Sequence, residues 1–597
     1  MIPGAEVVKQ SAPGETTSMR TPSALLLVLL ASCAAATPVT TPDPAPPAPP
    51  APSAPSASSA PYDLILEGGK VVDGTGAAWF WGDVAIRGGR IALVAPRGGL
   101  RDAQASERLD VRGMVVAPGF IDIQSHSRQN FLRTDGRVIS KITQGITTEI
   151  MGEGGTNAPA NEKTGFDPEE APAEHDFRGP RGFDKWLKAM EAHGAAPNFG
   201  SFVGASTIRM YGKGMAPGEA SPAELDSMRI ALRNAMEDGA FGLASALIYP
   251  PGNYAGTGEL IELAKAMAPY GGVYITHMRS EGNAWLEAID EAIRIGSEGG
   301  VPVEIYHLKA GGTRNWSKTP LAIAKIDSAR AAGVDVQANM YAYTAGGTGL
   351  TACLPPWSSA DGKLFDNLAD TAVRNRIREE MAQVQAQWEN LCELGGPENV
   401  LFLEFEKPAN AQYAAKRLSE VAQMMGKDWR DAAMDLITSE RSRVETIYFL
   451  MSEENVKLKM QQHWMKFGTD AGGNDPALPE GLTHPRSYGN YPRILGKYVR
   501  EEGVLTLEDA VRKMSSAVAT RISIPDRGLV RPGFFADLVV FDPATIGDRA
   551  TFEHPHQLSV GMRHVLVNGV AVVRDGAVTG AKPGRIVRGP GWKGGER

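Results

Sequence analysis

Eight short apolar runs, separated by segments with helical patterning, constrain the fold of this chain more than any other feature. Runs of this kind are typical of strands buried on both faces, which occur in parallel sheets covered by helices. Eight strands that alternate with helices are enough to close a barrel, so the sequence predicts a (β/α)8 barrel of the TIM type. The runs are Val115–Ile123, Ile146–Met151, Phe199–Val203, Gly242–Leu247, Val273–Thr276, Val303–Tyr306, Val334–Met340 and Trp464–Thr469.

The gaps between these runs carry helix signals. Ser221 stands just before one helical pattern, where an N-cap is expected, and Gly239 stands just after it, where a helix should stop. The seventh gap is much longer than the others and has helical patterns of its own. We therefore expect residues 351–445, approximately, to form a lid-like insertion.

The two ends of the folded part share a different pattern, in which short β-like runs alternate with glycine-containing turns. Residues 61–114 and 515–597 both show it, and they enclose the expected barrel at residues 115–514. Two such distant β-rich segments predict one small β-sandwich built from both termini. The expected fold class is thus α/β: a barrel with a terminal sandwich and an insertion.

The first residues resemble an export signal rather than part of a folded domain. An apolar stretch follows Met19 and Arg20; it is too short to span a bilayer comfortably and ends in small residues, as secretory signals do. The tetrad that ends at Cys33, "LASC", resembles the bacterial lipobox, whose cysteine is lipidated. We predict a lipoprotein-type signal peptide over residues 1–33. An ordinary signal peptide with a chance cysteine is the alternative.

Residues 34–60 consist almost entirely of Pro, Ala, Ser and Thr. This composition cannot bury apolar surface and behaves as a semi-rigid, extended tether. We expect an exported protein, periplasmic or anchored in the outer membrane of a bacterium, that meets the membrane only through a lipid on Cys33.

Charge and cysteine content limit the classes of partner that are expected. The 597 residues carry a formal net charge of −8 with both signs interspersed, and no run of Lys and Arg marks a nucleic-acid surface. Nucleic acid is therefore not an expected partner. The sequence does not decide whether Cys353 and Cys392 pair, nor does it fix the oligomeric state.

Polar residues stand at the ends of several predicted strands, where barrels of this type carry their chemistry. The fifth run leads to His277, the sixth to His307 and the eighth to Asp470, while His126 follows the first. Imidazoles and a carboxylate suit zinc with an open position for water, whose pKa zinc lowers to roughly 7. We therefore predict metal-assisted hydrolysis of an amide, in which Asp470 accepts the water's proton and returns it to the departing nitrogen.

Gln124 sets a limit on the number of metals. It projects from the same strand face as His126, where two histidines would grip one ion. An amide oxygen is a poorer ligand for zinc than an imidazole. We expect one tight Zn2+ and a second metal that is weak or absent, with Gln124 contacting the zinc water or the substrate carbonyl instead.

Longer blocks carry a family resemblance. They include "APGFIDIQSHS", "QGITTEIMGEGG", "YITHMRSEG", "IYHLKAGG", "GTDA" and "HPRSYGNYPRILGKYVRE". From about Tyr62 to near its C-terminus the chain resembles the amidohydrolase superfamily and, within it, the N-acyl-D-amino-acid deacylases. The resemblance implies a barrel with a bipartite sandwich, and hydrolysis of a linear amide that converts an N-acyl-D-amino acid to a carboxylate and a free D-amino acid.

The resemblance also implies a metal site. His277 and His307 would form it with a third ligand at the end of the second strand, where many members have a cysteine aligned with Gly154. We expect Glu153, one residue earlier, to be that ligand, and Glu149 is a weaker candidate. The alternative is a glutamate that merely pairs with a neighbouring base.

A substrate with a free carboxylate needs a cation, and arginine binds carboxylates bidentately. Arg486 lies beyond Asp470, while Arg279 and Lys309 each follow a histidine by two positions and so would share its strand face. The resemblance implies that Lys309 and Tyr341 contact the substrate's carboxylate. These bases could instead only balance nearby carboxylates.

Two further residues are assigned from their places in the motifs. Asp122 is expected to lie behind the metal ligands and orient one of them. Gly347 stands where relatives often have a serine in the carboxylate pocket, so the lost hydroxyl is expected to alter substrate or stereochemical preference.

Two other functions stay open. One is a cyclic-amide hydrolase of the hydantoinase or dihydroorotase kind, against which the fourth run offers no lysine for a carbamate bridge. The other is a catalytically inactive surface protein that binds ligands, against which His277, His307 and Asp470 argue. In the leading interpretation the partner is a small N-acyl amino acid or a related amide.

Overall fold

The computed structural model describes residues 61–164, 176–384, 387–478 and 481–595. The predicted signal peptide and tether, including Cys33, lie outside the described residues. Among the residues that are described, no helix is both long enough and apolar enough to cross a membrane.

A ring of parallel strands forms the centre of the molecule. Its order is β6 (Phe120–Asp122), β7 (Ile146–Met151), β8 (Asn198–Ser201) continued by β9 (Val203–Gly204), β10 (Gly242–Ala246), β11 (Val273–His277), β12 (Val303–Ile305), β13 (Val336–Met340) and β17 (Met465–Phe467). A bridge between Ser125 and Ala471 links the last strand to the first. The predicted (β/α)8 barrel is confirmed.

Helices connect these strands on the outside of the barrel. The main ones are α3 (Gly182–His193), α5 (Pro222–Glu237), α6 (Thr257–Met267), α7 (Trp285–Gly299), α8 (Thr319–Ala331), α14 (Glu453–Met460) and α16 (Leu507–Met514). Ser221 caps α5 as predicted: its hydroxyl accepts a hydrogen bond from the Glu224 amide, and the Glu224 carboxylate accepts one from the Ser221 amide. Gly239 then takes the left-handed conformation, with φ of +96°, and ends the helix.

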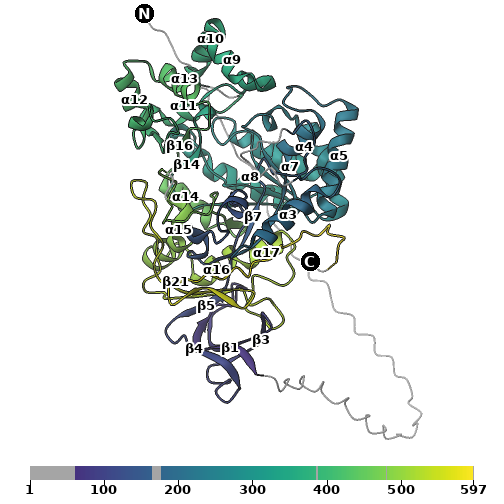
Figure 1. Cartoon of the computed structure of the whole chain (residues 1–597), viewed down its shortest axis with the longest axis vertical. Helices are drawn as coiled ribbons and strands as arrows, with labels where there is room; N and C mark the ends of the chain where they lie inside the picture. Colours follow the sequence, from purple (N-terminus) through teal and green to yellow (C-terminus); the bar gives the residue numbers. More distant parts are fainter. Residues whose placement is uncertain (1–60, 165–175, 385–386, 479–480, 596–597) are drawn as a thin grey trace, which may run out of the picture. The chain divides into compact units, whose positions relative to one another are not determined.

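Strands from both ends of the chain form one sheet, so the predicted β domain is confirmed. Its members are β1 (Tyr62–Val71), β2 (Phe80–Arg87), β3 (Arg90–Pro96), β4 (Ala105–Asp110), β5 (Val115–Pro118), β18 (Leu538–Phe541), β19 (Met562–Val567), β20 (Val570–Arg574) and β21 (Ala577–Val578). In Figure 1 the purple N-terminal strands and the yellow C-terminal strands lie together.

The first predicted barrel run is divided between the two sheets. β5 pairs with β1 and β18 in the β domain, and the barrel begins only at β6. Gly119 separates them: a Cβ there would lie 2.2 Å from Oγ1 of Thr147, so the crossing admits no side chain. The structure thus moves the boundary expected at residue 115 to Gly119.

The C-terminal region also divides. Helix α17 (Ser516–Arg521) and the residues just after it place Val518 and Ile522 in a core cluster with barrel-strand residues. Near the C-terminus, the amide of Val587 donates to the carbonyl of Phe199 in β8. Residues 515–597 therefore contribute to the β domain and also return to the barrel.

The insertion has a hydrophobic core of its own. Its helices are α9 (Leu364–Ala369), α10 (Thr371–Met381), α11 (Leu391–Gly395), α12 (Leu418–Met425) and α13 (Trp429–Glu440), and its sheet contains β14 (Gly346–Gly349), β16 (Glu445–Tyr448) and β15 (Val400–Phe402). A disulfide joins Cys353 to Cys392. Helices α9 to α13 are gathered in one part of Figure 1. Because β14 and β16 pair with each other, the insertion extends slightly beyond the expected 351–445.

Candidate metal centre and active site

Three of the predicted site residues lie at the C-terminal ends of barrel strands. His277 is the last residue of β11, and His307 and Asp470 lie just after β12 and β17. His307 and Asp470 have φ of +32° and +53°. Non-glycine residues seldom adopt this region, and such strained backbone is concentrated at functional sites.

Glu153 lies between the two histidines. Its Oε1 is 3.1 Å from Nδ1 of His277 and 3.2 Å from Nε2 of His307. Burial favours the neutral acid, but the imidazoles of His307, His126 and His277 hold the pKa of Glu153 well below its usual range. Its charge makes it a better metal ligand.

These residues fit a zinc ion. One ligand atom from each of Glu153, His277 and His307 lies within 4.8 Å of the other two. Two imidazole nitrogens and a carboxylate oxygen are a donor set that zinc prefers and that leaves a fourth position open. The predicted ligands are thus brought together.

The local backbone favours Glu153 over its neighbour as a candidate ligand at this position. Gly154 has φ of +67°, and a Cβ on it would lie 2.9 Å from the Cβ of Ala246. A cysteine at position 154 would need the backbone to shift. The longer side chain of Glu153 reaches the histidines without that shift.

Gln124 and His126 lie beside the second carboxylate oxygen of Glu153. The amide of Gln124 donates to Oε2 of Glu153 at 2.6 Å and to Oδ1 of Asp470 at 3.0 Å. Nε2 of His126 lies 2.9 Å from the same oxygen of Asp470. Desolvation opposes protonation of His126, but its bonds to Asp470 and Glu153 raise its pKa to about 9. Gln124 therefore ties the two carboxylates together.

Asp470 is paired with Arg486, the first residue of α15 (Arg486–Arg493). Their side chains meet at 2.7 Å, between Nη1 and Oδ2. Burial raises the pKa of Asp470, but the charges of Arg486 and His307 outweigh it and lower this pKa to about 2. Asp470 is therefore ionised throughout the neutral range.

Two buried donors lie beside this pair. The guanidinium of Arg486 stacks 4.6 Å from the ring centre of Tyr341. The Tyr341 hydroxyl and the Nε of Arg486 have no hydrogen-bond partner among the described residues. Because buried donors seldom go unpaired, these two suit an anionic ligand.

Arg279 does not project as the strand pattern predicted, whereas Lys309 does lie beside the histidine that it follows. Arg279 is bonded to Glu291 of α7 and to two loop carbonyl oxygens. The ammonium of Lys309 lies 2.6 Å from Nδ1 of His307 and 2.7 Å from both oxygens of Glu281. The alternation of strand side chains fails at Arg279 because β11 ends at His277.

Asp122 fixes the backbone around the site. Its carboxylate accepts hydrogen bonds from the amides of Gln124 and Thr469 and from the ammonium of Lys141, which is fully buried. It thus holds the two strand ends that carry Gln124 and Asp470, rather than touching a metal ligand directly. Glu149 lies on the far side of Lys141, at 3.5 Å, and not in the metal cluster.

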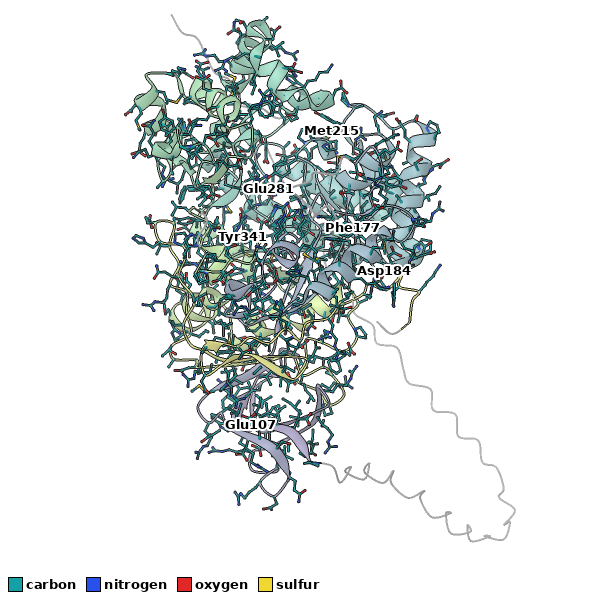
Figure 2. All side chains as sticks on the ribbon, viewed as in Figure 1. Glu107, Phe177, Asp184, Met215, Glu281 and Tyr341 are labelled. Carbon is teal, nitrogen blue, oxygen red and sulfur yellow. A yellow bond between two sulfur atoms is a disulfide. The ribbon has the colours of Figure 1, made fainter. Side chains whose placement is uncertain are left out.

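Two buried carboxylates beside the candidate metal centre were not predicted from the sequence. Glu281, labelled in Figure 2 with Tyr341, lies against the outer nitrogens of His277 and His307. Glu389 reaches from the insertion and accepts a hydrogen bond from the Glu281 amide. Burial and the charge of Glu281 raise the pKa of Glu389 to about 8. Glu281 follows His277 by four positions, a spacing that could have drawn attention to it, whereas nothing in the sequence marks Glu389.

Comparison with known proteins places this site in a family. The model of the amidohydrolase family matches residues 463–573. D-aminoacylase from Alcaligenes xylosoxydans xylosoxydans is 35% identical over 88% of this chain and 98% of its own length. N-acyl-D-glutamate deacylase from the same organism is 34% identical over 88% of this chain and 96% of its own.

A solved structure agrees with these relatives. N-acyl-D-glutamate deacylase from Bordetella bronchiseptica, complexed with zinc and a phosphonate inhibitor that mimics the tetrahedral intermediate, is 29% identical with a TM-score of 0.73. The match covers 89% of this chain and all of that one. Barrel, β domain and relatives agree: the chain belongs to the amidohydrolase family, in the group that contains D-aminoacylase and the N-acyl-D-amino-acid deacylases.

Proposed function

We propose that this protein is a zinc-dependent hydrolase that converts N-acyl-D-amino acids to a carboxylate and a free D-amino acid. The observation that carries the proposal is one cluster in which Glu153, His277 and His307 converge beside Asp470, with Arg486 and the Tyr341 hydroxyl close to that aspartate. The cluster holds a metal-ligand set, a proton acceptor and donors for a substrate carboxylate.

Glu153, His277 and His307 would hold the tight ion. Zinc bound there polarises an amide carbonyl and makes a water molecule more acidic. The Oε2 of Glu153 is engaged by Gln124, and the second group of possible ligands, His126, Glu153 and Asp470, shares that carboxylate. We therefore propose one tight zinc and, at most, a weak second metal.

Asp470 would move the proton. Because it is ionised at neutral pH, it accepts a proton from the attacking water and delivers it to the departing amine nitrogen. Gln124 and Arg486 hold its two oxygens from different sides, which fixes the direction of the carboxylate. A fixed carboxylate needs little reorganisation during the reaction.

Arg486 and Tyr341 would bind the substrate's carboxylate. The Arg486 Nε and the Tyr341 hydroxyl are buried donors that have no hydrogen-bond partner among the described residues. The ammonium of Lys309, the other expected contact, lies against Glu281 and 5.8 Å from the centre of the Tyr341 ring. A carboxylate bound here lies close to the group that protonates the leaving nitrogen.

The test is amine release by the purified protein from matched N-acyl-D- and N-acyl-L-amino acids, after chelation and again with zinc restored. We expect hydrolysis that needs zinc and favours the D series. Bound zinc without release from either series would refute the proposed substrate and favour another amide, a cyclic amide or a binding protein.

We also propose export and anchoring through a lipid on Cys33. The lipobox-like tetrad and the tether that follows it support this location. Cys33→Ser should remove the lipid and move the protein from the membrane fraction to the soluble fraction. Wild-type protein that is already soluble after export would contradict the anchor.

A further inference from the structure

Glu281 lies behind both metal-facing histidines, on the side away from Glu153. Its Oε1 is 2.8 Å from Nδ1 of His307, and its Oε2 is 3.6 Å from Nε2 of His277. The other nitrogen of each ring faces Glu153. The carboxylate is therefore within hydrogen-bond length of the outer nitrogen of His307. The outer nitrogen of His277 has no hydrogen-bond partner among the described residues.

Glu281 also belongs to a third group of possible ligands, with His277 and Glu389, but a buried ammonium lies against it. The ammonium of Lys309 lies 2.7 Å from each of its oxygens, and both side chains are buried. A second cation beside that ammonium would be repelled in a region of low dielectric constant. The metal therefore belongs on the Glu153 side of the rings.

A histidine binds a metal through a nitrogen that carries no proton. When the outer ring nitrogen donates its proton to an acceptor, the inner nitrogen is left free for the metal. We infer that Glu281 is a positioning residue that holds His307 in the tautomer that binds the metal. The inference rests on the proposed function because it requires a metal at the inner nitrogen of that ring.

Because of Lys309, the tautomer of His307 depends on the negative charge of Glu281. The Nζ of Lys309 lies 2.6 Å from Nδ1 of His307 as well as against Glu281. Glu281 and this ammonium therefore compete for the same ring nitrogen. Without the negative charge of Glu281, the ammonium would be the partner left at Nδ1, and the ring proton would move to Nε2, which faces Glu153. That tautomer cannot bind the metal.

The insertion helps to hold Glu281 in place. The Glu281 amide donates to the carboxylate of Glu389, and its carbonyl accepts from the amide of Gly311 at 2.7 Å. Glu389 stands close in sequence to Cys392, which the disulfide ties to Cys353. The backbone of Glu281 is thus fixed from both the insertion and the loop after β12.

The test measures zinc affinity of the metal-free protein by competition with a chromophoric chelator. Glu281→Gln should lower the affinity about 10- to 100-fold, the loss typical when an outer partner of a metal ligand is removed. Adding Lys309→Met should then recover at least about threefold, because the competing ammonium is gone. The 15N chemical shifts of the His307 ring in the metal-free protein report its tautomer, which should change in Glu281→Gln and which a merely structural role for Glu281 would leave unchanged.

Glu291→Gln is the matched control. This glutamate of α7 pairs with Arg279 and lies outside the metal cluster. The zinc affinity of this variant should stay within about twofold of wild type. An equally small effect of Glu281→Gln, or a double variant that binds no better than Glu281→Gln, would overturn the inference. If Glu281→Gln does not fold, Glu281→Asp keeps the charge but shortens the reach, and unchanged affinity there would overturn it as well.

The proposed function and this inference fail in different ways. Wild-type protein that binds no zinc would refute both. Wild-type protein that binds zinc but hydrolyses no N-acyl amino acid would refute only the substrate assignment, and the affinities of the variants would still decide the role of Glu281.

Discussion

Asp470 combines two properties that seldom occur together in one carboxylate. It is buried, yet its pKa is lowered to about 2, because the charge of Arg486 outweighs the effect of burial. A weak base of this kind needs help to take a proton, and a more acidic water molecule beside the metal would give it. A zinc held by Glu153, His277 and His307 would therefore share this task with the aspartate.

Asp470→Asn should lower kcat about 10²- to 10⁴-fold, because an amide cannot accept the proton. Zinc should remain bound, since Asp470 is not one of its three proposed ligands, Glu153, His277 and His307. Turnover and zinc content of the same sample test both statements. Asp290→Asn, which changes an exposed ion pair with Lys325, is the control. Unchanged turnover would remove Asp470 from the mechanism.

Gly347 offers room for a side chain near the carboxylate donors. A Cβ there would meet Arg486 and His484 at ordinary contact distances of 3.6 Å. A hydroxyl that adds one hydrogen bond to a bound carboxylate should lower KM about tenfold in Gly347→Ser. Steady-state kinetics on an N-acyl-D-amino acid would measure it, with Gly580→Ser, which meets nothing within 4 Å, as the control. An unchanged or higher KM would contradict this placement of the substrate.

His277, His307 and Asp470 could be placed from the sequence because each stands at the end of an apolar run, and strand ends meet at one face of a barrel. Arg279 could not be placed by extending the same alternation, although Lys309 does lie beside His307. The chain leaves the strand before Arg279, and nothing local in the sequence marks that point. The partner of Lys309, Glu281, comes from the loop of a different strand.

Helix α14 carries a buried lysine with an altered charge state. Lys459 donates to the carbonyl of Leu308 at 2.6 Å, and burial, followed by the charge of Lys309, lowers its pKa from 10.5 to about 7. Between these values the unfolded chain binds a proton that the folded chain does not. The folded state should therefore gain stability as pH rises from about 7 to 10.5, by up to ~1.4 kcal/mol per pH unit.

Lys459→Met should flatten that part of the pH dependence. The measurement is the free energy of unfolding in urea at about pH 7 and about pH 9. Lys457→Met, which changes an exposed lysine of the same helix, should keep the wild-type slope. Equal slopes for wild type and Lys459→Met would contradict the lowered pKa.

At the level of elements, the apolar runs predicted the barrel strands well because each run is buried on both faces. The predicted bounds differ from the observed ones where one apolar run is divided between two sheets, as β5 and β6 are at Gly119. The sheet of the insertion was missed because β14 is formed by Gly346–Gly349, a segment with three glycines and no apolar alternation. Its partner, β16, lies about a hundred residues away.

At the level of the whole molecule, the barrel brings distant segments to one face. Glu153 comes from the second strand, His277 and His307 from the fifth and sixth, and Asp470 from the eighth. The insertion adds Glu389 behind this cluster. The metal site therefore depends on the closed barrel, and a fragment of the chain would not contain it.

The most direct test is a titration of the chelated protein with zinc, in which amine release from an N-acyl-D-amino acid is followed against zinc per chain. One ion held by Glu153, His277 and His307 predicts that activity rises linearly and levels off at one equivalent. Activity that requires two equivalents, or that never appears although zinc binds, would contradict the account.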